Sequence, residues 1–361
     1  MRAGNYSHML KIPQSQAINL WNKFTSGYSN IVPFSFNPSL FNFYQQHFNW
    51  KPYYLLLYKE DEICGVFPIV NTDKAWVSLP HFSYGGILIN CKLDNFNYDT
   101  FINNIATKLK DQSSGFYKFN LNDISLFIET SSVRSFIRSF TNDGNVVRSE
   151  KVTSLFKLPD TIDDLLLLIN SNLKRKVNKS TKSNLLVHMG KHELLDDFYE
   201  VYSKNIKHLN SLTYKKKFFF DLISSWNIGS CNLFVVYLNE KPIGSSFLVS
   251  YMGFYENIYF ATLVEKRKNY ISDLLHWKMI TSCMETNKEK HHINSLYSFG
   301  RSTNNSGVFK YKNHWPVDNY PLYSYTNFSD IRKKDWLYSI WGSLPSFITL
   351  PIGSRLIRHI Y

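Results

Sequence analysis

Residues 293–315, which read INSLYSFGRSTNNSGVFKYKNHW, decide the fold prediction. The first part, residues 293–299, has the apolar pattern of a strand and runs into Gly300 and Arg301. A short polar loop at residues 304–307 then leads to a basic-aromatic segment. A strand end that offers backbone N–H groups, a fixed cation and hydroxyls suits a bound anion or a developing oxyanion. A surface hairpin with a Gly-Arg turn remains the alternative, because short motifs also match by chance.

Strand and helix patterns alternate around this stretch. Apolar runs predict strands at residues 233–238, 243–251 and 257–263, and helical patterns predict helices at 38–48, 161–186 (continuous or broken), 193–209 and 272–288. In the last helix Leu275, Met279 and Cys283 recur at four-residue spacing, which is typical of a buried face. This order predicts an α/β (α+β) fold with a mixed sheet.

The two halves of the chain repeat one pattern. Residues 55–70 (LLLYKEDEICGVFPIV) and 234–249 (FVVYLNEKPIGSSFLV) each read as a strand, a polar turn and a second strand, which predicts a β-hairpin. With 361 residues the chain is long enough for two domains. We therefore expect an N-terminal domain at residues 1–155, a C-terminal domain at 156–330 and an aromatic-basic tail at 331–361. The tail either docks on the protein or lies on a membrane surface.

The composition favours anionic partners. The net charge is +13, from 41 Lys and Arg against 28 Asp and Glu, which suits nucleic acid, phosphorylated cofactors or an anionic membrane face. Aromatic residues make up 17% of the chain, which argues against disorder. The four cysteines are far apart and form no CxxC pair, so neither a metal site nor a redox motif is expected. Without a signal-peptide pattern or a long apolar run, the sequence predicts a cytoplasmic protein.

The junction between the strand at 257–263 and the helix at 272–288 is a candidate anion site. Its loop contains Arg267, Lys268 and Asn269, and Ser272 or Asp273 is expected to cap the helix. Free N–H groups at a helix N-terminus, strengthened by nearby cations, bind anions. The alternative is a basic loop that is simply solvated.

Several segments, in this order, resemble the FemAB-like branch of the GNAT acyltransferases. They are a glycine-bearing segment at 78–86 (SLPHFSYGG), a basic helix at 171–184 (SNLKRKVNKSTKSN), the junction at 267–277 (RKNYISDLLHW), the pair YSFGRST and SGVFKYKNHW within 297–315, and the tail segment SIWGSLPSFITLPIGSRLIR at 339–358. The resemblance implies two tandem GNAT-like domains, each with a mixed, largely antiparallel sheet flanked by helices. It implies transfer of an acyl or aminoacyl group to an amine.

The resemblance also implies the ligands. The donor is acyl-CoA or aminoacyl-tRNA, and the acceptor is an amine of an amino sugar or of a glycan or cell-envelope precursor, free or lipid-linked. The pyrophosphate of coenzyme A is expected at the junction, on Arg267, Lys268, Asn269 and Ser272, although Tyr270 and Ile271 stand where the family has glycines. A lipid-linked acceptor would bring the protein to the inner face of the membrane.

The same motifs imply the catalytic residues. Lys312 matches the family's lysine near the acyl-transfer centre and is expected to face the oxyanion or a donor phosphate. Arg301 matches its strand-end arginine and is expected to clamp a phosphate or carboxylate. Candidate proton donors are Tyr297, Tyr311 and Tyr259, the last also a candidate substrate contact. Further substrate contacts are expected at Tyr84, Gly85, Gly86, Lys174 and Arg175.

Two positions depart from the family pattern. Ser298 stands where an acidic residue commonly precedes Phe-Gly-Arg, and Pro316 replaces the glycine after Trp315. No Glu or His stands out in the sequence as a general base, and His276 is most simply a helix-face residue.

Other functions remain open at this stage. The basic helix carries five positive charges between residues 174 and 182, which suit tRNA phosphates, a pyrophosphate-linked acceptor, anionic lipid or plain solvation. The alternatives to the acyl-CoA enzyme are therefore an aminoacyl-tRNA-dependent transferase and a non-catalytic protein of the same fold that binds nucleic acid or a membrane surface.

Overall fold

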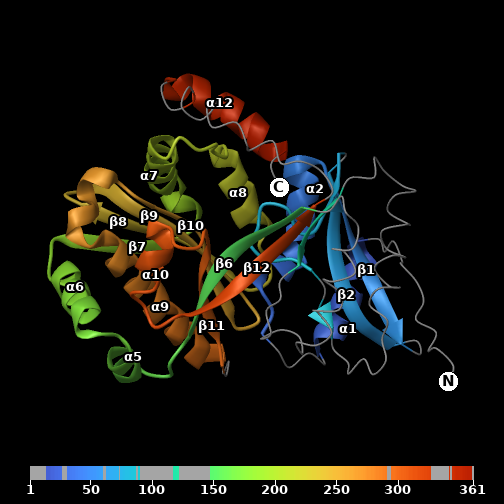
Figure 1. The fold of residues 1–361 in the computed structure, drawn as a ribbon, viewed down its shortest axis with the longest axis horizontal. Helices are drawn as coiled ribbons and strands as arrows, with labels where there is room; N and C mark the ends of the chain where they lie inside the picture. Colours follow the sequence, from blue (N-terminus) through green and yellow to red (C-terminus); the bar gives the residue numbers. More distant parts are fainter. Residues whose placement is uncertain are drawn as a thin grey trace. The chain divides into compact units, whose positions relative to one another are not determined.

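A computed structural model gives the structure of the chain. It describes residues 14–26, 31–59, 62–72, 74–86, 88–89, 117–121, 147–290, 294–326, 341 and 344–359. The chain divides into two compact units (Figure 1). Unit 1 draws on residues 1–152 and 320–329, and unit 2 on residues 153–319 and 330–360.

Unit 2 contains a mixed sheet with the strand order β6-β11-β10-β9-β8-β7. The strands are β6 (Val147–Lys157), β7 (Leu185–Gly190), β8 (Ser230–Leu238), β9 (Lys241–Tyr251), β10 (Phe254–Thr262) and β11 (Leu296–Ser302). Neighbours from β7 to β10 are antiparallel, whereas β10 and β11 are parallel. The parallel pair is possible because a long helix connects β10 to β11.

Helices cover both faces of this sheet (Figure 1). They are α5 (Ile162–Leu168), α6 (Ser171–Thr181), α7 (Leu195–His208), α8 (Lys216–Ser225), α9 (Ile271–Lys290) and α10 (Gly307–Lys312), with 3-10 turns η2 (His192–Leu194) and η3 (Val264–Asn269). The helix α12 (Ser346–Leu356), which is followed by the 3-10 turn η5 (Ile357–His359), lies beside α7 and not on the sheet. Phe260 of β10 stacks on His276 of α9, while its neighbour Tyr259 contacts Tyr202 of α7. Because neighbouring strand residues point to opposite faces, α9 and α7 lie on opposite sides of the sheet.

Unit 1 is built around a smaller sheet with the order β1-β2-β3-β5-β12, and β4 also pairs with β2. The elements are α1 (Gln14–Ser26), η1 (Phe34–Phe36), α2 (Ser39–Phe48), β1 (Lys51–Lys59), β2 (Glu62–Asn71), β3 (Trp76–Val77), β4 (Leu88–Ile89), β5 (Tyr117–Leu121) and β12 (Asp318–Thr326). Its core is aromatic: Trp21 stacks on Tyr54 at 5.5 Å and Phe48 on Trp50 at 4.2 Å. Such ring pairs stabilise beyond the area that they bury.

The predicted α/β class and both hairpins are confirmed, the latter as β1–β2 and β8–β9. The helix predicted over residues 161–186 is broken after Leu168, because the Asn170 side chain accepts a hydrogen bond from the Leu173 N–H and starts α6 there. The predicted end of this helix is wrong, since its last residues begin β7. The predicted domain boundaries stay predictions.

Candidate active site

The parallel pairing of β10 and β11 is short. It covers only three residue pairs, from Phe254–Leu296 to Glu256–Ser298. Both strands then continue, β10 as far as Thr262 and β11 as far as Ser302, without further pairing to each other along these described residues. β10 also shifts register against β9 between Asn257 and Tyr259. Beyond Glu256–Ser298 the facing edges of the two strands are therefore not joined by a ladder.

Gly300 shapes β11 where the ladder has ended. Its φ is +73°, and a Cβ added there would lie 3.2 Å from the backbone oxygen of Asn257. The Ser298 hydroxyl accepts a hydrogen bond from the Gly300 N–H at 3.0 Å. Glycine is needed because it adopts positive φ without strain and lets the two backbones approach closely.

Lys312 attaches the next helix to this turn. It is the last residue of α10, whose N-cap Ser306 accepts a hydrogen bond from the Phe309 N–H. The Lys312 Nζ donates to the backbone oxygens of Gly300 at 2.6 Å and Arg301 at 3.2 Å. The residue is 5% exposed. A lysine amine is thus held in the interior, next to the end of the β10–β11 ladder.

Glu256 supplies a carboxylate beside this amine. It is fully buried on β10, opposite Ser298 of β11. Burial lowers the pKa of Lys312 to about 7, while the negative charge of Glu256 raises that pKa and so limits the drop. The direction follows from desolvation, which penalises the charged ammonium. Lys312 therefore changes protonation state near neutral pH.

His276 of α9 lies between side chains of the two strands. Its ring stacks on Phe260 of β10 at 4.6 Å and lies 4.5 Å from Phe299 of β11. Its Nδ1 is 2.9 Å from the Tyr297 hydroxyl. Burial, together with the positive charge of Lys312, holds the pKa of His276 well below its usual value. The imidazole is therefore neutral at physiological pH.

Tyr297 and Tyr311 keep their protons at this site. Burial raises the pKa of each phenol well above its usual value, and the nearby Asp273 carboxylate raises that of Tyr311 further. Burial also raises the pKa of Asp273, which the charge of Lys176 opposes. Both phenols can donate hydrogen bonds at neutral pH, but neither becomes a phenolate there.

Comparisons with known proteins agree with this geometry. Residues 170–313 match the family model of the acetyltransferase (GNAT) domain, and the match runs from the start of α6 to the end of α10. The chain shares its fold with FemX at 12% identity, covering 88% of this chain and 97% of that one with a TM-score of 0.60. Residues 170–313 therefore form an acetyltransferase domain of the GNAT type, and the chain has the fold of FemX.

Two further solved structures show the same fold. A tandem GNAT protein from the clavulanic acid biosynthesis pathway aligns at 6% identity, over 88% of this chain and 97% of that one, with a TM-score of 0.57. L-PGS from Bacillus licheniformis aligns at 11% identity, over 94% and 96%, with a TM-score of 0.51. A search of the curated proteins finds no sequence match. The predicted pair of tandem GNAT-like domains is thus confirmed at the level of the fold.

The predicted catalytic residues fall into two groups. Tyr297, Tyr311 and Lys312 lie around His276, on the α9 side of the sheet. Tyr259 lies on the opposite side among aromatic rings of α7 and α8, where the charge of Arg301 lowers its otherwise raised pKa. Arg301 is exposed, and its backbone oxygen accepts a hydrogen bond from the Lys312 Nζ.

The predicted phosphate loop forms η3, directly before α9. Ser272 does not cap α9: the helix already begins at Ile271, after Tyr270 has turned the chain with a φ of +55°. Asn269 is exposed, and the side chains of Arg267 and Lys268 lie outside the described residues. Binding of phosphate by these four residues stays a prediction.

The basic helix α6 lies beside this loop. The Lys179 Nζ is 5.6 Å from the centre of the Tyr270 ring, within range of a cation–π contact. Lys174 is half-buried, and the exposed Arg175 donates to the Asn172 side chain at 3.0 Å. Cations of α6 and the start of α9 therefore share one region of unit 2.

The first-half candidates form a turn in unit 1. The Gly86 N–H donates to the Ser78 hydroxyl at 2.8 Å, and Gly86 has a φ of +106°. Tyr84 is fully buried, and Gly85 is buried beside it. A turn and a core position explain these residues without a ligand, so their contact with substrate stays a prediction.

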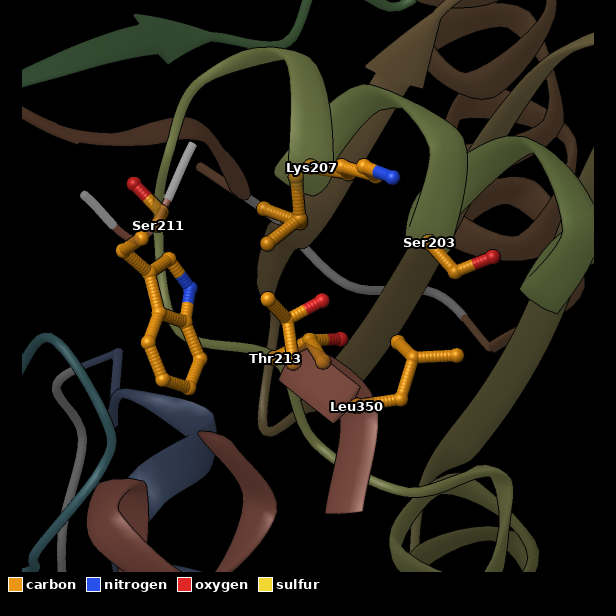
Figure 2. A pocket seen from close by; sticks show the side chains of 8 residues that line it. Ser203, Lys207, Ser211, Thr213 and Leu350 are labelled. Atoms are coloured by element: carbon orange, nitrogen blue, oxygen red, sulfur yellow. The ribbon is translucent and has the colours of Figure 1, made fainter. Parts of the chain in front are cut away.

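A small cavity lies elsewhere in unit 2, where the end of α7 meets α12 (Figure 2). It is lined by Ser203, Ile206, Lys207, Ser211, Thr213, Trp341, Thr349 and Leu350. None of the predicted site residues lines this cavity. Because residues of α12 line it together with residues of α7, docking of the tail on unit 2 is confirmed for α12.

The part of the chain that the structure describes contains no cluster of His, Cys, Asp or Glu arranged to hold a metal ion. Nor does any helix in this part combine the length and apolarity needed to cross a bilayer.

Sequence reasoning missed Glu256 as a site residue and gave His276 no role. A signal for Glu256 exists, because it is an acidic residue inside an otherwise apolar strand, FYENIYFAT. Charged residues are rarely buried unless they are paired. The cation near Glu256 is Lys312, and only the folding of α10 back onto the sheet brings it there.

Proposed function

We propose that this protein is a FemAB-like acyltransferase, which transfers an acyl group from acyl-CoA to an amine of an amino sugar or of a glycan or cell-envelope precursor. The observation that carries the proposal is the position of Lys312. Its amine is buried and fixed by the Gly300 and Arg301 backbone oxygens, directly beyond the last β10–β11 pair. A preorganised nitrogen in a site with little water interacts strongly with charge that develops during acyl transfer.

The edges of β10 and β11 suit the donor. Residues 257–262 and 299–302 belong to neighbouring strands that no longer pair with each other. An extended, amide-bearing arm such as that of coenzyme A can add to a strand edge through backbone hydrogen bonds. The start of α9, with Arg267, Lys268, Asn269 and Ser272, would then receive the donor's phosphates.

The remaining candidates take supporting roles. The exposed Arg301 would clamp a phosphate or carboxylate of a substrate. Tyr297 and Tyr311 would act as hydrogen-bond donors, since their phenols stay protonated at neutral pH. Lys174 and Arg175, with Tyr84, Gly85 and Gly86, would contact the acceptor. A lipid-linked acceptor would place the enzyme at the inner membrane face.

Aminoacyl-tRNA is the second candidate donor. The observation in its favour is the basic helix α6, which carries Lys174, Arg175, Lys176 and Lys179 and no acidic residue. Phosphate contacts of this kind release counterions, so binding would weaken steeply as salt is added. Acyl-CoA binding at the strand edges would respond less to salt.

Thiol release tests the proposal. The purified protein is incubated with acetyl-CoA and glucosamine, and free coenzyme A is measured with a thiol-reactive dye. We expect Lys312→Ala to lower the rate about 100- to 1000-fold, the cost of one oxyanion contact. The matched control is Lys310→Ala, an exposed lysine of the same helix, which should keep the wild-type rate.

The outcome against the proposal is equally clear. Equal rates for Lys312→Ala and Lys310→Ala would remove Lys312 from the reaction. If the wild type releases no thiol but binds aminoacyl-tRNA with a steep salt dependence, the second candidate donor is the right one.

A further inference from the structure

Two hydrogen bonds occupy two positions on the Lys312 amine nitrogen, and a third position remains. The Nζ donates one hydrogen to the Gly300 oxygen at 2.6 Å and another to the Arg301 oxygen at 3.2 Å. A protonated lysine has three N–H donors. A neutral lysine has two N–H groups and a lone pair. With two hydrogens committed to carbonyls, the third position holds either the last proton or the lone pair.

Titratable groups on β10 and α9 lie near the Lys312 amine and bear on its protonation state. From β10, the buried Glu256 carboxylate favours the protonated amine. From α9, His276 is close enough for the charge of Lys312 to affect it, and Asp273, one turn earlier, faces Tyr311 of α10. From β11, Arg301 meets the amine through its backbone oxygen. Glu256 is therefore the group that most directly sets how tightly Lys312 holds a proton.

We propose that Lys312, as a neutral amine, is the general base of the acyl transfer, and that Glu256 is a positioning residue that sets the proton affinity of Lys312. This inference rests on the proposed function and deepens it. The base is the component that no Glu or His supplied at the level of the sequence. The two roles follow one another: the neutral amine takes the proton of the acceptor nitrogen, and the resulting ammonium then faces the oxyanion.

The step balances as a proton shuttle. The acceptor nitrogen attacks the thioester carbonyl, a C–N bond forms, and the surplus proton on that nitrogen passes to the Lys312 lone pair. The C–S bond then breaks, and the Lys312 ammonium returns the proton to the departing sulfur of coenzyme A. The products are an amide and a free thiol, and Lys312 is neutral again.

His276 is the competing candidate, and its surroundings disfavour it. Its Nδ1 is engaged with the Tyr297 hydroxyl, and five aromatic rings surround the imidazole: Phe260, Tyr297, Phe299, Tyr311 and Trp315. Burial and the Lys312 charge keep its pKa well below its ordinary value, so it holds a proton poorly. The pKa of Lys312, about 7, matches what a general base needs at neutral pH.

The pH dependence of kcat/KM tests the inference, with acetyl-CoA and glucosamine as probes. The wild type should lose activity below an apparent pKa of about 7. Lys312→Arg keeps a cation and its donors but cannot lose its proton, so it should lose about 100-fold or more. Glu256→Gln removes the charge that raises the Lys312 pKa, so the acid limb should move to lower pH.

Each contrary result has a distinct meaning. If the kcat/KM of Lys312→Arg is within a few-fold of wild type, Lys312 is not the general base. The same holds if the acid limb of kcat/KM does not move in Glu256→Gln. Neither result contradicts the proposed acyl transfer. If Lys312→Arg does not fold, the Glu256→Gln limb decides. A wild type that releases no thiol overturns the proposed acyl-CoA function itself.

A measurement without substrate tests the general-base role of Lys312 separately from the proposed acyl-CoA function. The pKa of Lys312 falls from 10.5 in the unfolded chain to about 7 in the folded one, so between these values the unfolded chain binds the extra proton. The stability that this group contributes therefore rises with pH from about 7 to about 10.5. The unfolding free energy of wild type minus that of Lys312→Met should rise across this window. A constant difference would overturn the titration on which the base depends.

Discussion

The two edges of β10 behave differently. Towards β9 the strand pairs antiparallel along its whole length, from Phe254–Tyr251 to Thr262–Gly244. Towards β11 it pairs in parallel for three residues and then stops at Glu256–Ser298. One edge therefore fixes β10 in the sheet, and the other leaves backbone and side chains for chemistry. Lys312 and His276 lie where the second edge is no longer paired, and Glu256 belongs to the last pair before that point.

The largest effect is expected at Gly300, on the unpaired edge. Gly300→Ala introduces a Cβ at a φ of +73° and 3.2 Å from the Asn257 backbone oxygen, so β11 must shift. Because the oxygens of Gly300 and Arg301 hold Lys312, we expect activity to fall about 100-fold, as small misplacements of catalytic groups do. Thiol release measures the loss, with an expected destabilisation of about 1–3 kcal/mol in denaturant unfolding.

Gly307→Ala is the control for Gly300→Ala. A Cβ at Gly307, the first residue of α10, meets no atom within 4 Å. Its activity and stability should stay close to those of wild type. If the two alanine variants behaved alike, the shape of β11 at Gly300 would have no bearing on Lys312.

A smaller effect on activity is expected at Gly244, on the paired edge. A Cβ there would lie 2.5 Å from Ile271 Cγ2 and 3.3 Å from Leu275 Cδ1, both of α9. Overpacking of this kind costs about 1–3 kcal/mol in stability. Gly244→Ala should unfold at lower denaturant, yet keep the wild-type acid limb of kcat/KM, because it touches neither Lys312 nor Glu256. If the acid limb of kcat/KM shifted in Gly244→Ala, a change on the paired edge of β10 would also affect Lys312.

The sequence predicted the framework better than the site. Alternating and four-residue apolar patterns located the hairpins and α9, since local periodicity determines which face is buried. Motif position identified Lys312, Arg301, Tyr297 and Tyr311. The influence of the Glu256 charge on Lys312 joins residues 56 positions apart and depends on where α10 folds back onto β11. No local pattern carries that information.

Local signals also misled in one place and gave no prediction in another. Ser272 and Asp273 look like caps, but Tyr270 makes the turn and α9 starts one residue before Ser272. Asp273 is buried instead, facing Tyr311. For the basic-aromatic segment after the polar loop at 304–307 no secondary structure was predicted, and Ser306 caps a short helix there that carries Lys312.

Hydrogen–deuterium exchange with and without acetyl-CoA tests most directly whether the unpaired edge of β10 holds the donor. We predict that acetyl-CoA slows exchange at residues 257–262 and 299–302, while β8, on the far side of β9, is unchanged. Protection confined to other segments, such as those that line the cavity between α7 and α12, would contradict the account. Binding of acetyl-CoA without protection of β10 or β11 would contradict it as well.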